Sequence, residues 1–374
     1  MSEFQASNFK KAQGGSASNI VGKVEFTSPY FFVPPSGTTA ERPESCAPGT
    51  IRFNTDVGTI EVYRGDGIGW EYIQRRENQY LGGGTGSNVG TGTRGIFYAG
   101  QNPGEVDTID YITISTLGDA QDFGNATDTR DEVMCCASRT RGVGGGGYDG
   151  GTDDKIDFVT FSSTGNATDF GNLSVGRFSA AGMGDDIRGI FSGGATPTYK
   201  DVIDYITIAQ SGNAVDFGNL TAATYQPAAC SSSTRGIIGG GANPNATNTI
   251  QFVTIRTTGN ATDFGDLTAA RRGLSSSSNA TRGLFYAGLS NTNTIEFMTI
   301  ATSGNATDFG DLTYSTQEGA ACASSTRGIM AGGNPNVDTI NFIEIASKGN
   351  ASDFGNLTQS RKRLGGCSNG HGGL

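Results

Sequence analysis

Residues 234–267 have the sequence TRGIIGGGANPNATNTIQFVTIRTTGNATDFGDL, and this stretch decides the fold because variants of it occur six times along the chain. Thr-Arg-Gly, or a near copy of it, recurs in the same phase as Asp-Phe-Gly. Two markers that keep one register indicate a tandem structural repeat of about 47 residues. The repeated arginines are Arg94, Arg141, Arg188, Arg235, Arg282 and Arg327, and the repeated aspartates are Asp122, Asp169, Asp216, Asp263, Asp308 and Asp353.

The pattern inside one repeat predicts four short strands. A run of small residues, as in 320–324, precedes an Arg-Gly-apolar strand that ends in two glycines, as in 188–194. Apolar and polar residues then alternate over 249–255, which is typical of a strand with one buried face. Gly-Asn at 259–260 suits a tight turn, and 261–267 supplies the fourth strand. Four strands in about 47 residues is the size of one β-propeller blade.

The end of the chain predicts how the repeats close. After the sixth repeat, residues 363–370 copy the beginning of a first strand, and the array stops there. We expect this strand to pair with the repeat that begins near Thr93, so that no sheet edge is left open. The two glycines that end the second strand resemble the kelch repeat, although the tryptophan and the spaced tyrosine of that repeat are missing. The fold predicted for residues 93–374 is therefore all-β, a six-bladed kelch-like β-propeller with four-stranded blades. A β-solenoid with 47-residue coils is the alternative.

The part of the chain before the repeats has a different composition. Residues 1–20 are polar and predict an extended N-terminal arm. Residues 21–80 predict a β-rich anchoring domain, since 49–73 has the pattern of a compact β meander with a hairpin loop. A Gly-rich linker over 81–92 leads into the repeats.

Composition and charge exclude several classes of function. The chain has 26 Lys and Arg against 36 Asp and Glu, a net charge of −10, which disfavours nucleic acid as a partner. A single histidine and the absence of Cys-x-x-Cys spacing argue against metal sites, cofactors and Ser-His-Asp triads. No apolar run is long enough for membrane insertion, and the start of the chain lacks a signal-peptide pattern. We expect the protein to have no enzymatic activity. We also expect it to be synthesised in a cytoplasm.

Two features resemble proteins of bacterial viruses. The run Gly-Thr-Ile-Arg-Phe-Asn-Thr-Asp at 49–56, Ile-Glu-Val-Tyr at 60–63 and Trp-Glu-Tyr-Ile at 70–73 resembles a short module of structural proteins in tailed bacteriophages. The repeats, with Gly-Asn-Ala-Thr-Asp-Phe-Gly and a terminal Gly-His-Gly-Gly-Leu, are similar to virion proteins of marine cyanophages. The resemblance implies a structural or fibre-like component of a virion, made in the host cytoplasm, and it brings no catalytic residues.

The repeated arginines and aspartates predict structure rather than a site. We expect each arginine to pair, within or between blades, with a carboxylate or with loop carbonyls and so to set the register. A polyvalent anion or calcium site is the alternative for these twelve residues.

The loops between the second and third strands differ among the repeats and predict a binding rim, because loops on a rigid scaffold commonly carry recognition. Asn, Asp and Thr suit hydrogen bonds to sugar hydroxyls, and Tyr148 and Tyr199 are candidate stacking surfaces. Solvated turns are the equally weighted alternative. The candidate binding residues are Asn102, Tyr148, Asp149, Thr198, Tyr199, Lys200, Asn243, Asn245, Asn291, Asn334 and Asn336.

The cysteines and the histidine predict no chemistry. Cys136, Cys230 and Cys322 each lie five residues before a repeated arginine, and Cys367 takes the matching place in the closing strand. We expect buried small-residue positions near a central channel, with free thiols. His371 is expected to belong to a flexible tail.

Two functional hypotheses follow. In the first, residues 1–80 dock on other virion proteins, and the propeller is displayed as a fibre-like or decoration component that contacts host-surface glycan through the rim loops. In the second, the chain is a purely architectural collar, tail or capsid-cementing subunit without receptor binding. A homo-oligomer on the particle is open under both hypotheses.

Overall fold

The computed structural model describes residues 34–43, 46–56, 59–65, 69–72 and 93–374. The chain divides into two compact units, Met1–Asn78 (unit 1) and Gln79–Leu374 (unit 2). The predicted arm (1–20) and linker (81–92) lie outside the described residues, as does part of 21–80. The described regular structure consists of strands and one 3-10 turn, Thr39–Glu41, so the prediction of an all-β chain is confirmed.

The described residues of unit 1 form one four-stranded sheet. Its order is β1 (Ser36–Gly37), β2 (Ile51–Asn54), β3 (Thr59–Tyr63) and β4 (Trp70–Tyr72), with β1 parallel to β2 and the other pairs antiparallel.

A buried carboxylate organises this small sheet. Glu61 is fully buried on β3 and accepts hydrogen bonds from Arg42 Nη2 at 2.6 Å and from Asn54 Nδ2 at 3.2 Å. Burial alone would raise the pKa of Glu61, but the hydrogen bonds from Arg42 and Asn54 and the charge of Arg52 hold it below its usual value. Three polar residues of the 49–63 motif, Arg52, Asn54 and Glu61, are therefore buried in the sheet.

Unit 2 contains six four-stranded antiparallel sheets, and in each the four strands follow one another up and down. Five sheets use consecutive strands, except that a small hairpin of β14 (Ala195–Thr196) and β15 (Thr198–Tyr199) interrupts one of them. The five are β8 (Met134–Ala137), β9 (Arg141–Tyr148), β10 (Thr152–Thr160) and β11 (Thr168–Asn172); β12 (Ala181–Gly184), β13 (Arg188–Ser192), β16 (Val202–Thr207) and β17 (Val215–Asn219); β18 (Ala228–Ser231), β19 (Arg235–Gly239), β20 (Thr249–Thr254) and β21 (Thr262–Asp266); β22 (Ser275–Ser278), β23 (Arg282–Tyr286), β24 (Thr292–Thr299) and β25 (Thr307–Thr316); β26 (Ala320–Ala323), β27 (Arg327–Ala331), β28 (Val337–Glu344) and β29 (Ser352–Arg361).

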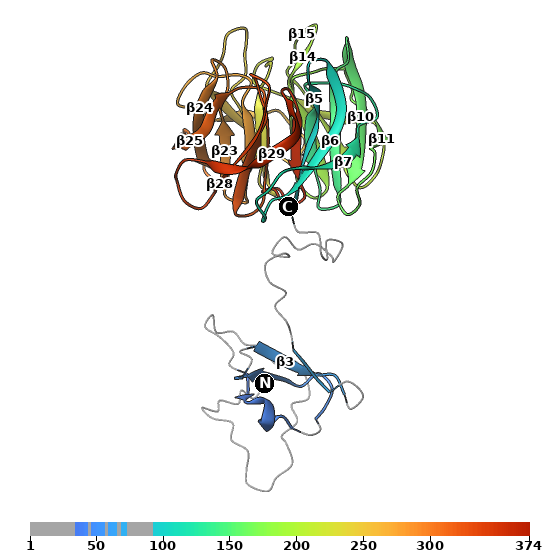
Figure 1. Ribbon diagram of the computed structural model, residues 1–374, viewed down its shortest axis with the longest axis vertical. Helices are drawn as coiled ribbons and strands as arrows, with labels where there is room; N and C mark the ends of the chain where they lie inside the picture. Colours follow the sequence, from blue (N-terminus) through green and yellow to red (C-terminus); the bar gives the residue numbers. More distant parts are fainter. Residues whose placement is uncertain (1–33, 44–45, 57–58, 66–68, 73–92) are drawn as a thin grey trace, which may run out of the picture. The chain divides into compact units, whose positions relative to one another are not determined.

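The sixth sheet joins the two ends of unit 2. The last strand, β30 (Gly365–Ser368), pairs with β5 (Arg94–Gln101), which continues to β6 (Glu105–Thr113) and β7 (Gln121–Asn125). Gly365 lies opposite Tyr98 and Ser368 opposite Gly95. Figure 1 shows β29, near the end of the chain, beside the β5–β7 strands that begin unit 2. The predicted pairing of the orphan strand with the first repeat is confirmed.

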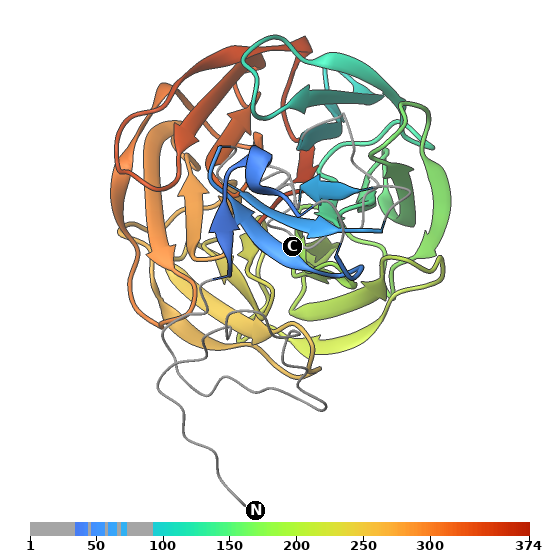
Figure 2. The same cartoon turned by 90° about the horizontal axis from the view of Figure 1, so that it is seen from below.

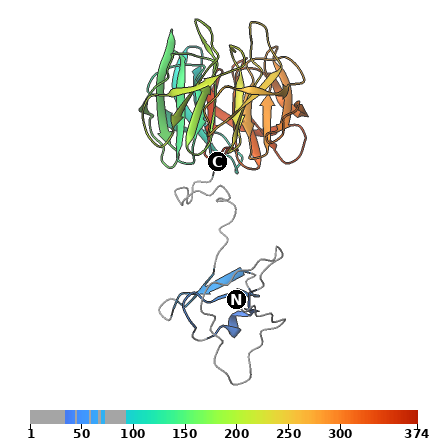
Figure 3. The same ribbon diagram turned by 180° about the vertical axis from the view of Figure 1, so that it is seen from behind.

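The six sheets follow one another around a common axis. The first strands β8, β12, β18, β22, β26 and β30 each contact the next in this order, and β30 contacts β8 again. Figure 2 shows the sheets placed around the axis, and Figure 3 shows from behind that their strands stand side by side along it. Six hydrophobic clusters fill the spaces between neighbouring sheets, each drawing its residues from two sheets. The core is therefore divided into layers between sheets.

The Asp-Phe-Gly triplet has a clear part in this packing. Phe123 is buried, and its carbonyl accepts a hydrogen bond of 2.7 Å from the amide of Gly165 in the turn of the next sheet. Gly124 has φ +144°, and a Cβ at this position would overlap the Gly165 carbonyl. All six triplets make this contact. The contact of Gly355 with Gly118 lies between the β26–β29 sheet and the sheet that β30 closes. Glycine recurs here because no side chain fits.

Buried ion pairs cross four of the six junctions between neighbouring sheets. They are Arg130–Asp157, Arg177–Asp204, Arg271–Glu296 and Arg361–Asp110. At the other two junctions the equivalent residues are neutral on both sides. These pairs of equivalent positions are Thr224 with Gln251 and Thr316 with Asn341. A buried charge is kept only where its partner is present, which is what the cost of an unpaired buried charge demands.

Candidate functional site

The repeated arginines connect neighbouring sheets. Arg94 Nη1 donates to the carbonyl of Phe161 in the next sheet at 2.6 Å, and its guanidinium lies 4.7 Å from the centre of the Tyr111 ring in its own sheet. Arg141, Arg188, Arg235, Arg282 and Arg327 repeat both contacts, with carbonyl distances of 3.0, 3.0, 3.2, 2.6 and 3.2 Å. Arg327 reaches Ile114, which again connects the last repeat to the first. The structure places these six side chains in the framework, bonded to carbonyls.

The repeated aspartates are not their partners. Asp122, Asp169, Asp216, Asp263, Asp308 and Asp353 are all exposed on the outermost strands. Within the described ranges, no group of three or more His, Cys, Asp or Glu is placed to hold a metal ion. The aspartates are separated around the outside of the ring, and the structure does not bring them together.

The candidate binding residues all lie on one face of unit 2, which we call the rim face: the loops 101–105, 148–151, 195–200, 242–247, 288–291 and 333–336. Backbone bridges hold these loops to the segments that lead into the first strand of the same sheet, as between Tyr148 and Asp131 or between Ala242 and Tyr225. Of the candidates, Tyr148, Asp149, Thr198, Asn243, Asn245, Asn291 and Asn336 are exposed, and Asn102, Tyr199, Lys200 and Asn334 are half-buried.

Four aromatic rings form a continuous group on the rim face, and we call Tyr148, Phe178, Tyr199 and Tyr225 the aromatic cluster. The Tyr148 and Phe178 ring centres are 5.6 Å apart, and Phe178 and Tyr225 are 6.2 Å apart, both edge to face. Tyr199 stacks on Tyr225 at 5.3 Å with only 5° between the ring planes. The β14–β15 hairpin positions Tyr199 for this stacking. The structure thus connects the two predicted tyrosines, which lie in different sheets.

Phe178 and Tyr225 are not among the predicted binding residues. They occupy one repeat position, shared with Asp131, Arg272, Gln317 and Lys362, just before the first strand of a sheet. The side chain at this position differs in type among the repeats although the backbone is equivalent. That variation in the sequence is the signal that could have found them. The Arg272 guanidinium lies 5.9 Å from the Tyr225 ring centre, and burial raises the pKa of the Tyr225 hydroxyl.

The cysteines of the first strands line the channel along the axis. Cys135, Cys136, Cys230, Cys322 and Cys367 are buried and free, and burial raises the pKa of Cys230 to about 12. Each sulfur packs against the backbone of a neighbouring sheet. A Cβ on Gly283, for example, would lie 2.8 Å from Cys230 Sγ. Protonated thiols packed in this way are poor nucleophiles and poor metal ligands.

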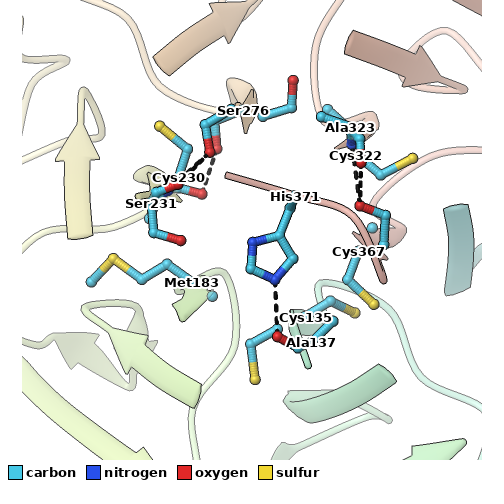
Figure 4. A pocket seen from close by; sticks show the side chains of 18 of the residues that line it. Cys135, Ala137, Met183, Cys230, Ser231, Ser276, Cys322, Ala323, Cys367 and His371 are labelled. Atoms are coloured by element: carbon cyan, nitrogen blue, oxygen red, sulfur yellow. Dashed lines mark hydrogen bonds between the residues drawn. The ribbon is translucent and has the colours of Figure 1, made fainter. Parts of the chain in front are cut away.

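The prediction of a flexible tail around His371 is wrong. Residues 369–374 fold into the end of the channel opposite the rim face, and Figure 4 shows His371 near the axis, among side chains of the surrounding sheets. His371 Nε2 is 2.9 Å from the Ala137 carbonyl, and Nδ1 accepts the amide of Gly373 at 3.1 Å. Burial lowers the pKa of His371. The two glycines that follow His371 allow this, because a Cβ on Gly372 or Gly373 would overlap carbonyls at the ends of the inner strands.

Comparison with known proteins adds no assignment: no family model matches the chain, and no curated protein matches it. Among the described residues, no helix has the length and apolar character needed to cross a membrane.

Proposed function

We propose that residues 93–374 form a six-bladed β-propeller of the kelch-like type. The support is the cyclic order of contacts among the first strands, the six hydrophobic clusters between successive sheets, and the repeated arginine contact that returns from Arg327 to Ile114. A β-solenoid has two free ends and gives no reason for β30 to pair with β5.

We propose that this ring is a binding module without catalytic activity, carried by a virion structural protein. The resemblance of 49–73 to a bacteriophage module supports the virion assignment, and residues 1–80 would dock on other virion proteins. The Arg42–Glu61–Asn54 network supports a framework role for the polar residues of that module, since these side chains are committed to each other.

The rim face is proposed to contact host-surface glycan, and the aromatic cluster is the observation that carries this function. Tyrosine and phenylalanine faces pack against the apolar faces of sugar rings, while hydroxyl and amide groups nearby supply hydrogen bonds. Tyr148 is 36% exposed, and the stacked Tyr199–Tyr225 pair is held rigidly by the hairpin and the following sheet. A rigid aromatic surface costs little conformational entropy on binding, which favours recognition at this place.

Binding of host-cell lipopolysaccharide fragments to the full chain tests the proposal. Replacing 195–200 by Gly and Ser, or Tyr199 by Ala, removes the stacked ring and should weaken binding at least tenfold. Asp353→Ala, on an exposed outer strand, is the matched control and should bind normally. If the unaltered protein binds no fragment, while particles lacking it lose a collar, tail or capsid joint, the architectural hypothesis replaces the adhesive one.

A further inference from the structure

Six equivalent residues surround the channel opening on the rim face, and we call them the mouth ring: Glu132, Ser179, Gln226, Gly273, Glu318 and Arg363. The amide of each donates to the carbonyl of the one before it, at 2.6–3.2 Å, and Glu132 donates to Arg363, so the hydrogen bonds form a closed circle. Every sheet contributes one residue to this opening.

The backbone of the mouth ring is strained. Five of its residues have side chains and yet take the left-handed conformation, with φ between 53° and 57°; Gly273 has φ 64°. Left-handed non-glycine residues are uncommon, and groups of them are found where a structure serves binding or catalysis. Because the six backbones are equivalent, geometry does not require glutamate, serine, glutamine or arginine here. The variety of side chains on one repeated backbone points to recognition.

The side chains form a single hydrogen-bonded network around the opening. Arg363 Nε lies 3.1 Å from Glu318 Oε2 and 3.3 Å from Glu132 Oε1. Ser179 Oγ donates to Glu132, and Gln226 Nε2 donates to Glu318 Oε1 at 3.0 Å. Glu132 and Glu318 thus keep acceptor capacity on a network that already fixes their orientation.

The network encloses a cavity of about 100 Å³ whose deeper wall is apolar, with Val133, Pro227, Leu274 and Leu364. Gly273 leaves a gap in the polar ring, since the nearest atoms to a Cβ there would be Glu318 Cγ at 3.4 Å and Gln226 Oε1 at 3.8 Å. Beside the opening, the buried Asp131 carboxylate has one oxygen, Oδ1, without a hydrogen-bond partner among the described residues. The cavity therefore combines an apolar base, fixed polar groups and one open side.

The charges around the opening balance. The mouth ring and the residues that precede it carry three carboxylates, Asp131, Glu132 and Glu318, and three cations, Arg272, Lys362 and Arg363. Arg363 is already surrounded by all three carboxylates. Arg272 and Lys362 are not among the residues that line the cavity, and Arg363 is the one cation in the described lining. Because Arg363 is already paired, the cavity offers no free cation to an acidic sugar, and an added ammonium group would compete with Arg363.

We propose that the mouth ring is a subsite for one uncharged terminal sugar residue, which enters beside Gly273 and hydrogen-bonds through its hydroxyls to Gln226, Glu132 and Glu318. This inference rests on the proposed glycan binding, and it specifies where on the rim face a neutral chain end is bound. The aromatic cluster adjoins the subsite, since Phe178 and Tyr225 directly precede Ser179 and Gln226 in the chain.

Saturation-transfer NMR of the full chain with free glucose, galactose and mannose, and with glucuronate and glucosamine, tests the subsite. At least one neutral hexose should bind, and both charged sugars should bind at least tenfold more weakly. Gly273→Gln should abolish the hexose signal, because it places a side chain in the gap on a backbone that already carries glutamine at 226. Gly304→Gln, in an exposed turn with open space around a Cβ, is the matched control.

The outcomes separate the two proposals. If no hexose binds, if a charged sugar binds equally well, or if Gly273→Gln binds normally, the subsite is overturned. Should Gly273→Gln unfold, Gln226→Ala replaces it, and unchanged hexose binding by that variant refutes the subsite. Loss of lipopolysaccharide binding on Tyr199→Ala with hexose binding retained supports both proposals. Hexose binding without any lipopolysaccharide binding refutes only the proposed function.

Discussion

Removing Arg361 should destabilise unit 2 at the point where its two ends meet. Arg361 is fully buried at the end of β29, and its Nη2 lies 2.6 Å from Asp110 Oδ2 on β6, across the junction between the last sheet in chain order and the one that β30 closes. Its Nη1 also donates to the carbonyls of Ala99 at 3.0 Å and Thr108 at 2.7 Å. Arg361→Thr leaves the Asp110 carboxylate buried without its cation.

The size of the effect follows from the environment of Asp110. Breaking a buried ion pair from one side costs about 3–5 kcal/mol, because the remaining charge stays desolvated. For a domain of this size, that loss corresponds to a fall in Tm of about 5–8 °C. Thr358 still donates to Asp110 Oδ1 at 2.6 Å, which places the expected loss at the lower end of the range.

The protein itself supplies the compensating change. Two other junctions have threonine at the arginine position and a neutral amide at the carboxylate position: Thr224 with Gln251, and Thr316 with Asn341. The double variant Arg361→Thr with Asp110→Asn copies the Thr316–Asn341 junction and should recover most of the stability, to within about 1–2 kcal/mol of the unaltered protein.

Urea unfolding and calorimetry of the two single variants and the double variant measure these differences. A single variant that loses less than about 1 kcal/mol contradicts the assigned cost of an unpaired buried charge. A double variant no more stable than Arg361→Thr contradicts the equivalence of the charged and neutral junctions. Lys155→Thr is the control, since this half-exposed lysine makes a surface pair with the half-exposed Asp128 and should cost about 1 kcal/mol or less.

Three further predictions concern single positions. Gly355→Ala should destabilise unit 2 by at least about 2 kcal/mol in urea unfolding, because its Cβ would overlap the Gly118 carbonyl. Gly118 has a similar positive φ but open space around a Cβ, so Gly118→Ala is the control and should cost about 1 kcal/mol. Burial raises the pKa of Glu132 to about 7, so between about pH 4.5 and 7 the folded state keeps a proton that the unfolded state releases. The free energy of unfolding should therefore fall as pH rises through this range, and Glu132→Gln should flatten that part of the stability profile. Burial lowers the pKa of His371, with Asp185 and Arg139 nearby, so its ring NMR signals should titrate below pH 6.5. The contribution of the tail to the free energy of unfolding should decline as pH falls below that value. A titration midpoint at or above 6.5 would mean that the tail is outside the channel.

Much of the architecture was predictable because its causes are local. Alternation over 249–255, the Gly-Asn turns and the small-residue runs each specify a strand or a turn from adjacent residues, and repetition makes every local pattern visible six times. The orphan strand at the end of the chain was recognisable for the same reason. The predicted binding residues also lie together on one face, since all occupy the same place in the repeat.

The residues that complete the site were less visible. Phe178 and Tyr225 look like ordinary apolar residues before a strand, and only their stacking with Tyr148 and Tyr199 gives them a place on the rim face. His371 looked like part of a polar tail, because nothing adjacent to it in the chain indicates that it is buried.

The sequence by itself determined the number of repeats, the strands within each and the strand that closes the array, since these depend on short-range pattern. Only the tertiary structure decided which charges pair across the junctions, which six residues meet around the channel opening and where the tail lies. Those contacts join residues of different sheets, as between Arg361 and Asp110, and they exist only once the ring is closed. Two buried charges must pair because both lose their water where the sheets meet. That junction brings together residues from distant parts of the chain, so no single stretch of sequence contains it.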